Sequence, residues 1–306
     1  DEDGNSTWRR SPGGLVSALA PVMAQRGGAW VGWHGAPDET LEPFDHDVFH
    51  LVPVTLSELE VTRYYEGFSN ATLWPLYHDV IAPPEFHRTW WYAYRRVNER
   101  FARRAAETAS QGATVWVQDY QLQLVPRMLR RLRPDVTIGF FNHIPFPPTE
   151  IFSQLPWRRA VLDGLTGADL IGFQRPGDAQ NFQRCARKYL GAQFTKGTAV
   201  MTEDTADGQG TTWTVHAESY PISIDVESIK ELASDPQVQA RAREIREELG
   251  NPDTVFLGVD RLDYTKGIRH RIKAYGELLE DGEISVENSV LVQVASPSRE
   301  RVDSYR

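Results

Sequence analysis

The sequence predicts an α/β protein with mostly parallel sheets, built as two Rossmann-like blocks of which the second is only partly present. Short apolar runs alternate with amphipathic stretches along the chain, which is typical of parallel strands joined by helices. The 306 residues correspond to about two domains at roughly 150 residues each. Apolar residues make up 41% and charged residues 25% of the chain, as in ordinary globular proteins.

The first block alternates strands with helices. The long helix at 90–109 is indicated by apolar residues that recur at steps of three and four from Tyr94 to Ala105. A glycine- and threonine-rich segment at 192–216 favours a hairpin, and Pro221 limits strand pairing in the extended segment after it. Strands are expected at 29–33, 48–54, 114–117, 136–141 and 170–173, and further helices within 11–25 and at 122–132, 158–165 and 178–189.

The second block follows a charged helical stretch and a Gly-Asn-Pro turn. We place the boundary between residues 223 and 252, and assign 1–223 to an N-terminal domain and 224–306 to a linker and the start of a C-terminal domain. In this block, helices are expected at 238–249, at 268–279 and from about residue 298, and strands at 255–259 and 289–294.

Composition and charge exclude several classes of function. With 33 Lys and Arg against 42 Asp and Glu, the net charge of −9 argues against a general nucleic-acid binder. The single cysteine, Cys185, permits neither an internal disulfide nor a cysteine-based metal site. No apolar run reaches the roughly 18 residues of a membrane-spanning helix. Pro21 interrupts the apolar stretch near the N-terminus, so we expect no signal peptide. The use of a single cysteine is typical of a reducing compartment, so we expect a cytoplasmic protein.

Two polar groups directly follow apolar strands, where parallel sheets bind their ligands. Asp119 follows the strand at 114–117, and its carboxylate can accept hydrogen bonds from sugar hydroxyls. A helix N-cap is an equally simple interpretation of this aspartate. His143 precedes a loop that three prolines make rigid. The alternative for His143 is a core histidine bonded to the backbone.

A third strand end carries two cations. Arg261 and Lys266 follow the strand at 255–259, and Gly267 opens a helix. Helix N-termini favour anions, and neighbouring cations strengthen this preference, so the pair could clamp a diphosphate leaving group. The alternative is a surface loop whose salt bridges use the aspartates at 260 and 263.

Weaker signals complete the candidate set. Gly14 ends a glycine pair before a helix, where the backbone can approach a phosphate or a sugar. Tyr65 and Trp74 could pack on a sugar ring or bond a phosphate, or could simply form an aromatic core. Arg299 is either a phosphate contact or a surface charge. No metal-ligand spacing occurs, so we predict no protein-bound metal.

Six segments in one order resemble the trehalose-6-phosphate synthase family of retaining glycosyltransferases with the GT-B fold. The resemblance spans the whole chain. The segments are Ser-Pro-Gly-Gly-Leu at 11–15, Tyr-Tyr-Glu-Gly-Phe-Ser-Asn-Ala-Thr-Leu-Trp-Pro at 64–75, Gln-Asp-Tyr-Gln-Leu at 118–122, His-Ile-Pro-Phe-Pro at 143–147, Tyr-Pro-Ile-Ser-Ile-Asp at 220–225 and Val-Asp-Arg-Leu-Asp-Tyr-Thr-Lys-Gly at 259–267.

The resemblance implies glucose transfer from a nucleoside diphosphate glucose to glucose 6-phosphate, giving α,α-trehalose 6-phosphate with retained configuration. It implies a front-face mechanism without an enzyme nucleophile, small-molecule substrates and no cofactor or metal. It also implies the roles of individual residues: Arg261, Lys266 and Gly14 on the donor; His143 on the transferred sugar; Asp119 on the acceptor hydroxyls; Tyr65, Trp74 and Arg299 on the acceptor phosphate; and Trp33 in the same cleft.

Some features depart from the family pattern. Gln118 and Gln121 stand where the family often has histidines. The family's first strand with its Asn-Arg pair and its C-terminal Asp-Gly-Met-Asn segment are not found, so we expect truncation at both ends and little turnover by these residues alone. Alternatives are a related synthase that uses glycerol 3-phosphate or a cyclitol phosphate, or a non-catalytic sugar-phosphate sensor. The donor base can be UDP, ADP or GDP, and a homo-oligomer is possible.

Overall fold

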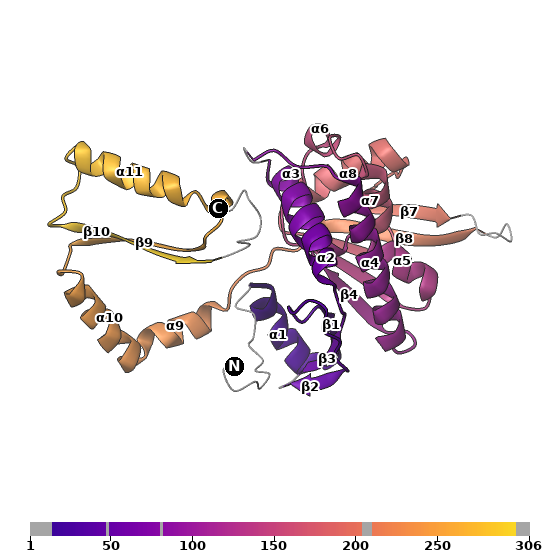
Figure 1. Cartoon of the computed structure of the whole chain (residues 1–306), viewed down its shortest axis with the longest axis horizontal. Coiled ribbons are helices and arrows are strands. Elements are labelled where there is room, and N and C mark those ends of the chain that lie inside the picture. Colours follow the sequence, from indigo (N-terminus) through magenta and orange to yellow (C-terminus); the bar gives the residue numbers. More distant parts are fainter. Residues whose placement is uncertain (1–13, 47–48, 80–81, 204–209, 298–306) are drawn as a thin grey trace. The chain divides into compact units, whose positions relative to one another are not determined.

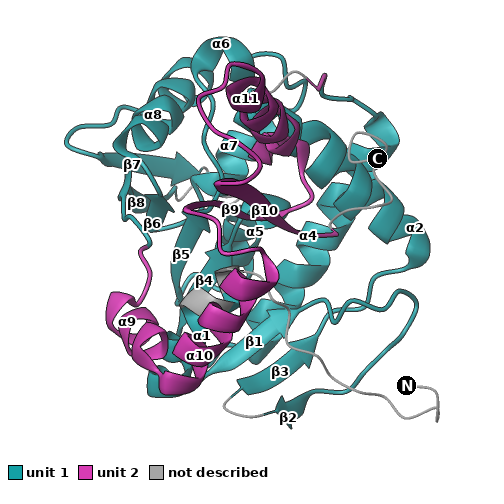
Figure 2. Cartoon of the chain, turned by 90° about the vertical axis from the view of Figure 1, so that its left-hand side faces the viewer, with its two compact units in different colours: residues 1–79, 84–222 teal, residues 80–83, 223–306 magenta. Residues whose placement is uncertain are grey.

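The computed structural model describes residues 14–46, 49–79, 82–203 and 210–297 (Figure 1). The chain forms two compact units, coloured separately in Figure 2. The first comprises residues 1–79 and 84–222, and the second comprises residues 80–83 and 223–306.

The main sheet of the first unit has five strands in the order β4-β5-β6-β8-β7. Four neighbouring strands are parallel, and β7 runs antiparallel to β8, so the hairpin expected at 192–216 is confirmed. The sheet therefore has the parallel character that the alternation of elements predicts. Its strands are β4 (Thr114–Gln118), β5 (Thr137–Asn142), β6 (Leu170–Phe173), β7 (Thr198–Glu203) and β8 (Thr211–Ser219).

A smaller sheet has the order β1-β3-β2. In it, β1 pairs with β3 in parallel and β2 pairs with β3 antiparallel. Its strands are β1 (Ala29–Gly32), β2 (Phe44–His46) and β3 (Phe49–Pro53), of which β2 was not expected from the sequence.

The longest helix of the described residues, α4 (Arg88–Thr108), packs against the helices at Val125–Leu132 and Val61–Leu73. Its buried face carries Tyr94, Val97, Phe101 and Ala105, as the spacing predicts. The other helices expected in the first block are confirmed within a few residues; the one expected at 122–132 begins at Val125, after a short 3₁₀ turn. The confirmed helices are α1 (Gly14–Arg26), α5 (Val125–Leu132), α7 (Arg158–Leu165) and α8 (Pro176–Leu190). The sequence did not predict the 3₁₀ turn η2 (Tyr120–Leu122) or the short helix α6 (Thr149–Phe152).

Most of the aromatic stretch at 64–74 lies in a 13-residue π-helix, η1 (Val61–Leu73), which follows the short helix α2 (Glu58–Glu60). Its last residue, Trp74, begins the short helix α3 (Trp74–His78). π-helical turns are rare and occur often at functional sites. Gly67 is required in η1, because a Cβ there would lie 2.6 Å from the ring of Trp90. Sequence periodicity missed this element, since its i to i+5 bonding does not follow the α-helical repeat.

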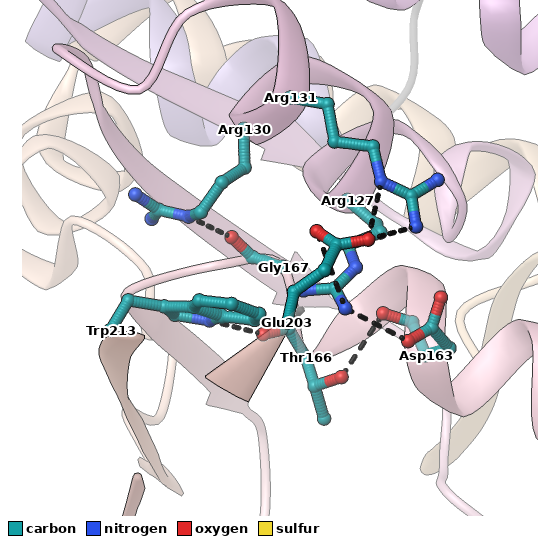
Figure 3. A network of polar contacts seen from close by, with 8 residues as sticks. All are labelled: Arg127, Arg130, Arg131, Asp163, Thr166, Gly167, Glu203 and Trp213. Carbon is teal, nitrogen blue, oxygen red and sulfur yellow. Dashed lines mark hydrogen bonds and ion pairs between the residues drawn. The ribbon is translucent and has the colours of Figure 1, made fainter. Parts of the chain in front are cut away.

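An arginine network fastens the β7–β8 hairpin to α5 and α7 (Figure 3). The guanidinium of Arg127 lies 4.4 Å from the ring centroid of Trp213, between Asp163 at 3.4 Å and Glu203 at 3.7 Å. Glu203 also accepts a hydrogen bond of 2.9 Å from Arg131. The hydrogen bond from Arg131 holds the pKa of Glu203 below its usual range.

The second unit contains two parallel strands joined by a helix. The strands β9 (Thr254–Arg261) and β10 (Ser289–Ser296) pair in parallel, and α11 (Ile268–Glu280) connects them. This is a βαβ unit of the kind predicted for the second block. Two further helices precede it, α9 (Val226–Ser234) and α10 (Pro236–Glu248), and the helix expected from about residue 298 lies outside the described residues.

Candidate functional site

Asp119 and His143 lie at the carboxyl ends of the neighbouring parallel strands β4 and β5. Gln118 stands opposite Phe141 in the ladder, so both segments leave the sheet at the same edge. The Asp119 Oδ1 atom accepts the backbone N–H of Tyr120 at 2.9 Å and that of His143 at 3.1 Å. The Asp119 carboxylate therefore connects the loop after β4 to the loop after β5. The two backbone N–H groups that it accepts also fix its orientation.

The backbone of Asp119 adopts φ 68° and ψ 173°. This region is almost exclusive to glycine and costs a side-chain-bearing residue on the order of 1–3 kcal/mol. The Asp119 N–H donates to the carbonyl of Phe141 at 2.8 Å, which helps to hold the conformation. Asp119 is the N-cap of η2, so the N-cap interpretation is correct as far as it goes. A helix cap does not require a strained backbone, however. The strain favours a functional role for the carboxylate.

His143 is half-buried, and its ring bonds to a side chain rather than to the backbone. Its Nε2 atom lies 2.8 Å from Oε1 of Gln118, and its ring centroid lies 4.7 Å from that of Phe141. Burial lowers the pKa of His143 to about 4, so the imidazole is neutral at pH 7. A neutral imidazole can accept or donate one hydrogen bond at each ring nitrogen according to its tautomer.

The three aromatic candidates differ in burial: Trp74 is buried, whereas Trp33 and Tyr65 are half-buried and lie next to each other. Trp74 is buried, and its ring centroid lies 5.7 Å from that of Tyr120, the residue after Asp119. Trp33 and Tyr65 are both half-buried, with ring centroids 6.0 Å apart. The structure thus joins Trp74 to the Asp119 segment, and brings Trp33 next to Tyr65.

The loop after β9 is organised by one buried aspartate. Oδ1 of Asp263 accepts the backbone N–H of Thr265 at 2.9 Å and its hydroxyl at 2.8 Å. Gly267 then adopts φ 64°, a left-handed conformation suited to glycine, and is the N-cap of α11. Arg261 and Lys266 stand on this rigid loop with exposed side chains.

The aspartates beside these cations are engaged with other groups. Oδ2 of Asp260 accepts a 2.7 Å hydrogen bond from Arg271, which lowers the pKa of Asp260. The Arg261 guanidinium lies 3.9 Å from Asp263, at the limit of an ion pair, and Lys266 forms no salt bridge within the described ranges. Both aspartates thus take part in ion pairs, as the alternative interpretation expects, although Asp260 is paired with Arg271 on α11. Two cations at the start of a helix suit an anionic ligand.

Little can be said of the surroundings of two further candidate residues, Gly14 and Arg299. Gly14 is the first residue of α1, and Arg299 lies outside the described residues. A hollow of about 480 Å³ opens beside the first residues of β1, and none of its lining residues is a candidate. The lining residues are Gly28, Ala29, Pro43, His50, Val52, Arg104, Glu107 and Thr108.

Sequence reasoning missed the polar partners of the candidates. In the sequence, Gln118 stands out only as a departure from the family pattern, yet in the structure its Oε1 atom lies 2.8 Å from Nε2 of His143. Asn70, inside η1, accepts a 2.7 Å hydrogen bond from the hydroxyl of Tyr120. Gln118 and Tyr120 flank Asp119 in the sequence, and this adjacency was the signal that could have identified both as site residues.

The described residues include neither a metal-binding group nor a membrane-spanning helix. No group of three or more His, Cys, Asp or Glu side chains there is placed to hold a metal ion. Of the helices that are described, none combines the length and apolar character needed to cross a membrane.

The sequence matches the family model of glycosyltransferase family 20 over residues 1–306. A trehalose-6-phosphate synthase from Mycolicibacterium gilvum (strain PYR-GCK) is 57% identical over 309 residues, covering 99% of this chain and 61% of the relative. The chain thus spans about three fifths of the length of the curated relatives that it matches.

Solved structures share the fold. One is described as an α,α-trehalose-phosphate synthase (UDP-forming) from Burkholderia xenovorans in complex with glucose-6-phosphate. It has a TM-score of 0.85 and 29% identity, over 96% of this chain and 65% of that one. Another, from E. coli, is described as bound with UDP-2-fluoro glucose; its TM-score is 0.81 at 32% identity, over 98% and 65% of the two chains.

Proposed function

This chain belongs to glycosyltransferase family 20, and on that premise we propose that the protein transfers glucose from a nucleoside diphosphate glucose to glucose 6-phosphate. The product is α,α-trehalose 6-phosphate, and the configuration at the anomeric carbon is retained. The names of the relatives and the two ligands bound in the solved structures support this choice of substrates.

The acceptor-binding side chains of this proposal come from the first unit, except for Arg299, which belongs to the second. The carboxylate of Asp119 accepts hydrogen bonds from hydroxyls of the acceptor glucose. Tyr65, Trp74 and Arg299 contact its phosphate, and Trp33 lines the same cleft beside Tyr65. Aromatic side chains suit this role because they offer both a face for a sugar ring and a polar tip.

The donor diphosphate is bound by Arg261 and Lys266, with Gly14 approaching the donor through its backbone. Both cations are exposed on a loop that Asp263 orders through two hydrogen bonds, and their positive charge suits a diphosphate. Fixed positive charge stabilises a diphosphate that gains negative charge as it leaves.

The proposed reaction proceeds on one face of the sugar. The acceptor hydroxyl oxygen bonds to the anomeric carbon as the bond from that carbon to the diphosphate oxygen breaks, and the hydroxyl proton passes to the departing phosphate. No enzyme nucleophile is then needed. His143, neutral at pH 7, contacts the transferred sugar by hydrogen bonding rather than through a positive charge.

A single observation carries the assignment of the site to function: Asp119 is held in a backbone region that aspartate ordinarily avoids, with its carboxylate bonded to the backbone of His143. Strain of this kind persists where surrounding structure enforces it and is concentrated at active sites.

The test is nucleoside diphosphate release by the full-length protein. UDP-, ADP- and GDP-glucose are each offered with glucose 6-phosphate and with glycerol 3-phosphate. Release that depends on glucose 6-phosphate, with trehalose 6-phosphate as product, is expected and names the donor. Release only with glycerol 3-phosphate would overturn the acceptor, and no release with any pair would favour a sensor.

A further inference from the structure

The strand register places Gln118 and His143 on one face of the sheet. Gln118 is opposite Phe141, and His143 is two residues after Phe141. Side chains alternate between faces along a strand, so Phe141 and His143 point to the same side. The 4.7 Å separation of their rings and the 2.8 Å bond from the histidine to Gln118 agree with this geometry.

The contact with Gln118 defines which nitrogen of His143 carries the proton. The amide Oε1 of Gln118 has no proton to give, so the ring donates from Nε2. Because burial keeps the ring neutral, Nδ1 is then unprotonated and can accept a hydrogen bond. The nearby carboxylate of Asp119 bonds the backbone N–H of His143, not its ring.

Gln118 also lowers the stability of the folded protein through its side-chain amide. Its amide nitrogen is buried and, among the described residues, has no hydrogen-bond partner. Burying an unpaired donor destabilises a protein, and an apolar side chain of similar volume avoids that cost. The contact with His143 is therefore the physical advantage that an amide brings at this position.

We propose that Gln118 is a positioning residue that holds His143 as the neutral Nε2–H tautomer and presents Nδ1 as an acceptor to a hydroxyl of the transferred sugar. The second half of this inference rests on the proposed function, because it assumes that a sugar binds beside His143. The first half concerns the protein alone and can be measured without substrate.

The first experiment observes the histidine tautomer directly. The full-length protein, labelled with ¹⁵N-histidine, is studied by long-range ¹H–¹⁵N correlation, and the His143 signal is assigned among the eight histidines with His143→Gln. The Nε2–H tautomer is expected, and Gln118→Leu should mix the two tautomers. The matched control is Gln121→Leu, since Gln121 makes no hydrogen bond to His143. An Nδ1–H tautomer, or no change in Gln118→Leu, overturns the inference.

The second experiment measures kinetics. Gln118→Leu should lower kcat/KM by roughly 10- to 100-fold, as expected when a contacting group is misplaced by up to an ångström. Gln118→Glu keeps an acceptor for Nε2–H but favours the charged ring, so the acid limb of its pH profile should move to higher pH. An unchanged rate and an unchanged pH profile contradict the role of Gln118. Inactivity of the unsubstituted protein instead contradicts the proposed function, and the tautomer result still stands.

Discussion

Oδ1 of Asp119 accepts the backbone N–H of His143 at 3.1 Å, although 24 residues separate the two positions in the chain. The parallel pairing of β4 with β5 makes this contact possible, because it brings both strand ends to one edge. The bond fixes the loop that carries His143 relative to the carboxylate. Changes at Asp119 should therefore alter both stability and catalysis.

Asp119→Gly and Asp119→Ala separate backbone strain from the loss of the carboxylate. Both variants lose the two hydrogen bonds to backbone N–H groups, but only glycine relieves the strain at φ 68°. We expect Asp119→Gly to be more stable than Asp119→Ala by about 1 kcal/mol, since relief of strain outweighs glycine's greater freedom when unfolded. Chemical denaturation measures the difference, and both variants should have lost nearly all turnover. Equal stability would show that the conformation is unstrained.

Arg261→Met and Lys266→Met should each reduce kcat/KM by on the order of 100- to 1,000-fold, the usual effect of removing one charge-stabilising group at a reacting centre. Their stability should change little, because both side chains are exposed. Initial rates with nucleoside diphosphate glucose and glucose 6-phosphate measure the effect. Lys273→Met, which removes an exposed cation from α11, is the control. A similar loss of activity in this control would argue against a specific diphosphate contact.

Protonation of His143 should destabilise the folded protein in acid. Its pKa is about 4 when folded against 6.5 in an unfolded chain, so the folded state binds the proton less readily. The stability linked to the neutral ring is present above pH 6.5 and is lost as the pH falls toward 4, by about 3 kcal/mol in total. Denaturation of the wild type and of His143→Gln at several pH values isolates this contribution. Parallel pH dependences of the two proteins would contradict it.

Glu203→Gln should destabilise the first unit by about 2 kcal/mol, because it leaves the buried guanidinium of Arg127 with one carboxylate fewer. The control Glu107→Gln makes the same substitution in an exposed pair with Arg104 and should cost less than about 0.5 kcal/mol. Denaturant midpoints of the two variants provide the comparison. Equal destabilisation would mean that the network in Figure 3 contributes no more than a surface ion pair.

Turnover should survive treatment with EDTA, since Arg261 and Lys266 supply the positive charge that stabilises the leaving diphosphate in the proposed mechanism. Activity is measured after exhaustive chelation and after adding back Mg²⁺ or Mn²⁺. Loss on chelation followed by recovery with either ion would show that a metal shares this role.

The sequence alone was sufficient to predict the order of most helices and strands and to identify the strand ends that carry polar groups. The face of α4 from Tyr94 to Ala105 could be predicted because burial imposes the helical period on apolar residues. Asp119 and His143 could be found because parallel sheets gather their ligands at the carboxyl ends of strands. The motifs gave the family, which the family model confirms.

Tertiary structure decided how those residues are used. The π-helix η1 depends on packing around Gly67 and Trp90, and local propensity does not report such contacts. The strained backbone of Asp119 and its bond to His143 exist only once β4 and β5 have paired. The neutral state of His143 likewise follows from burial. Sequence specifies which groups are present, whereas strain, pKa and tautomer depend on neighbours that only the folded chain brings together.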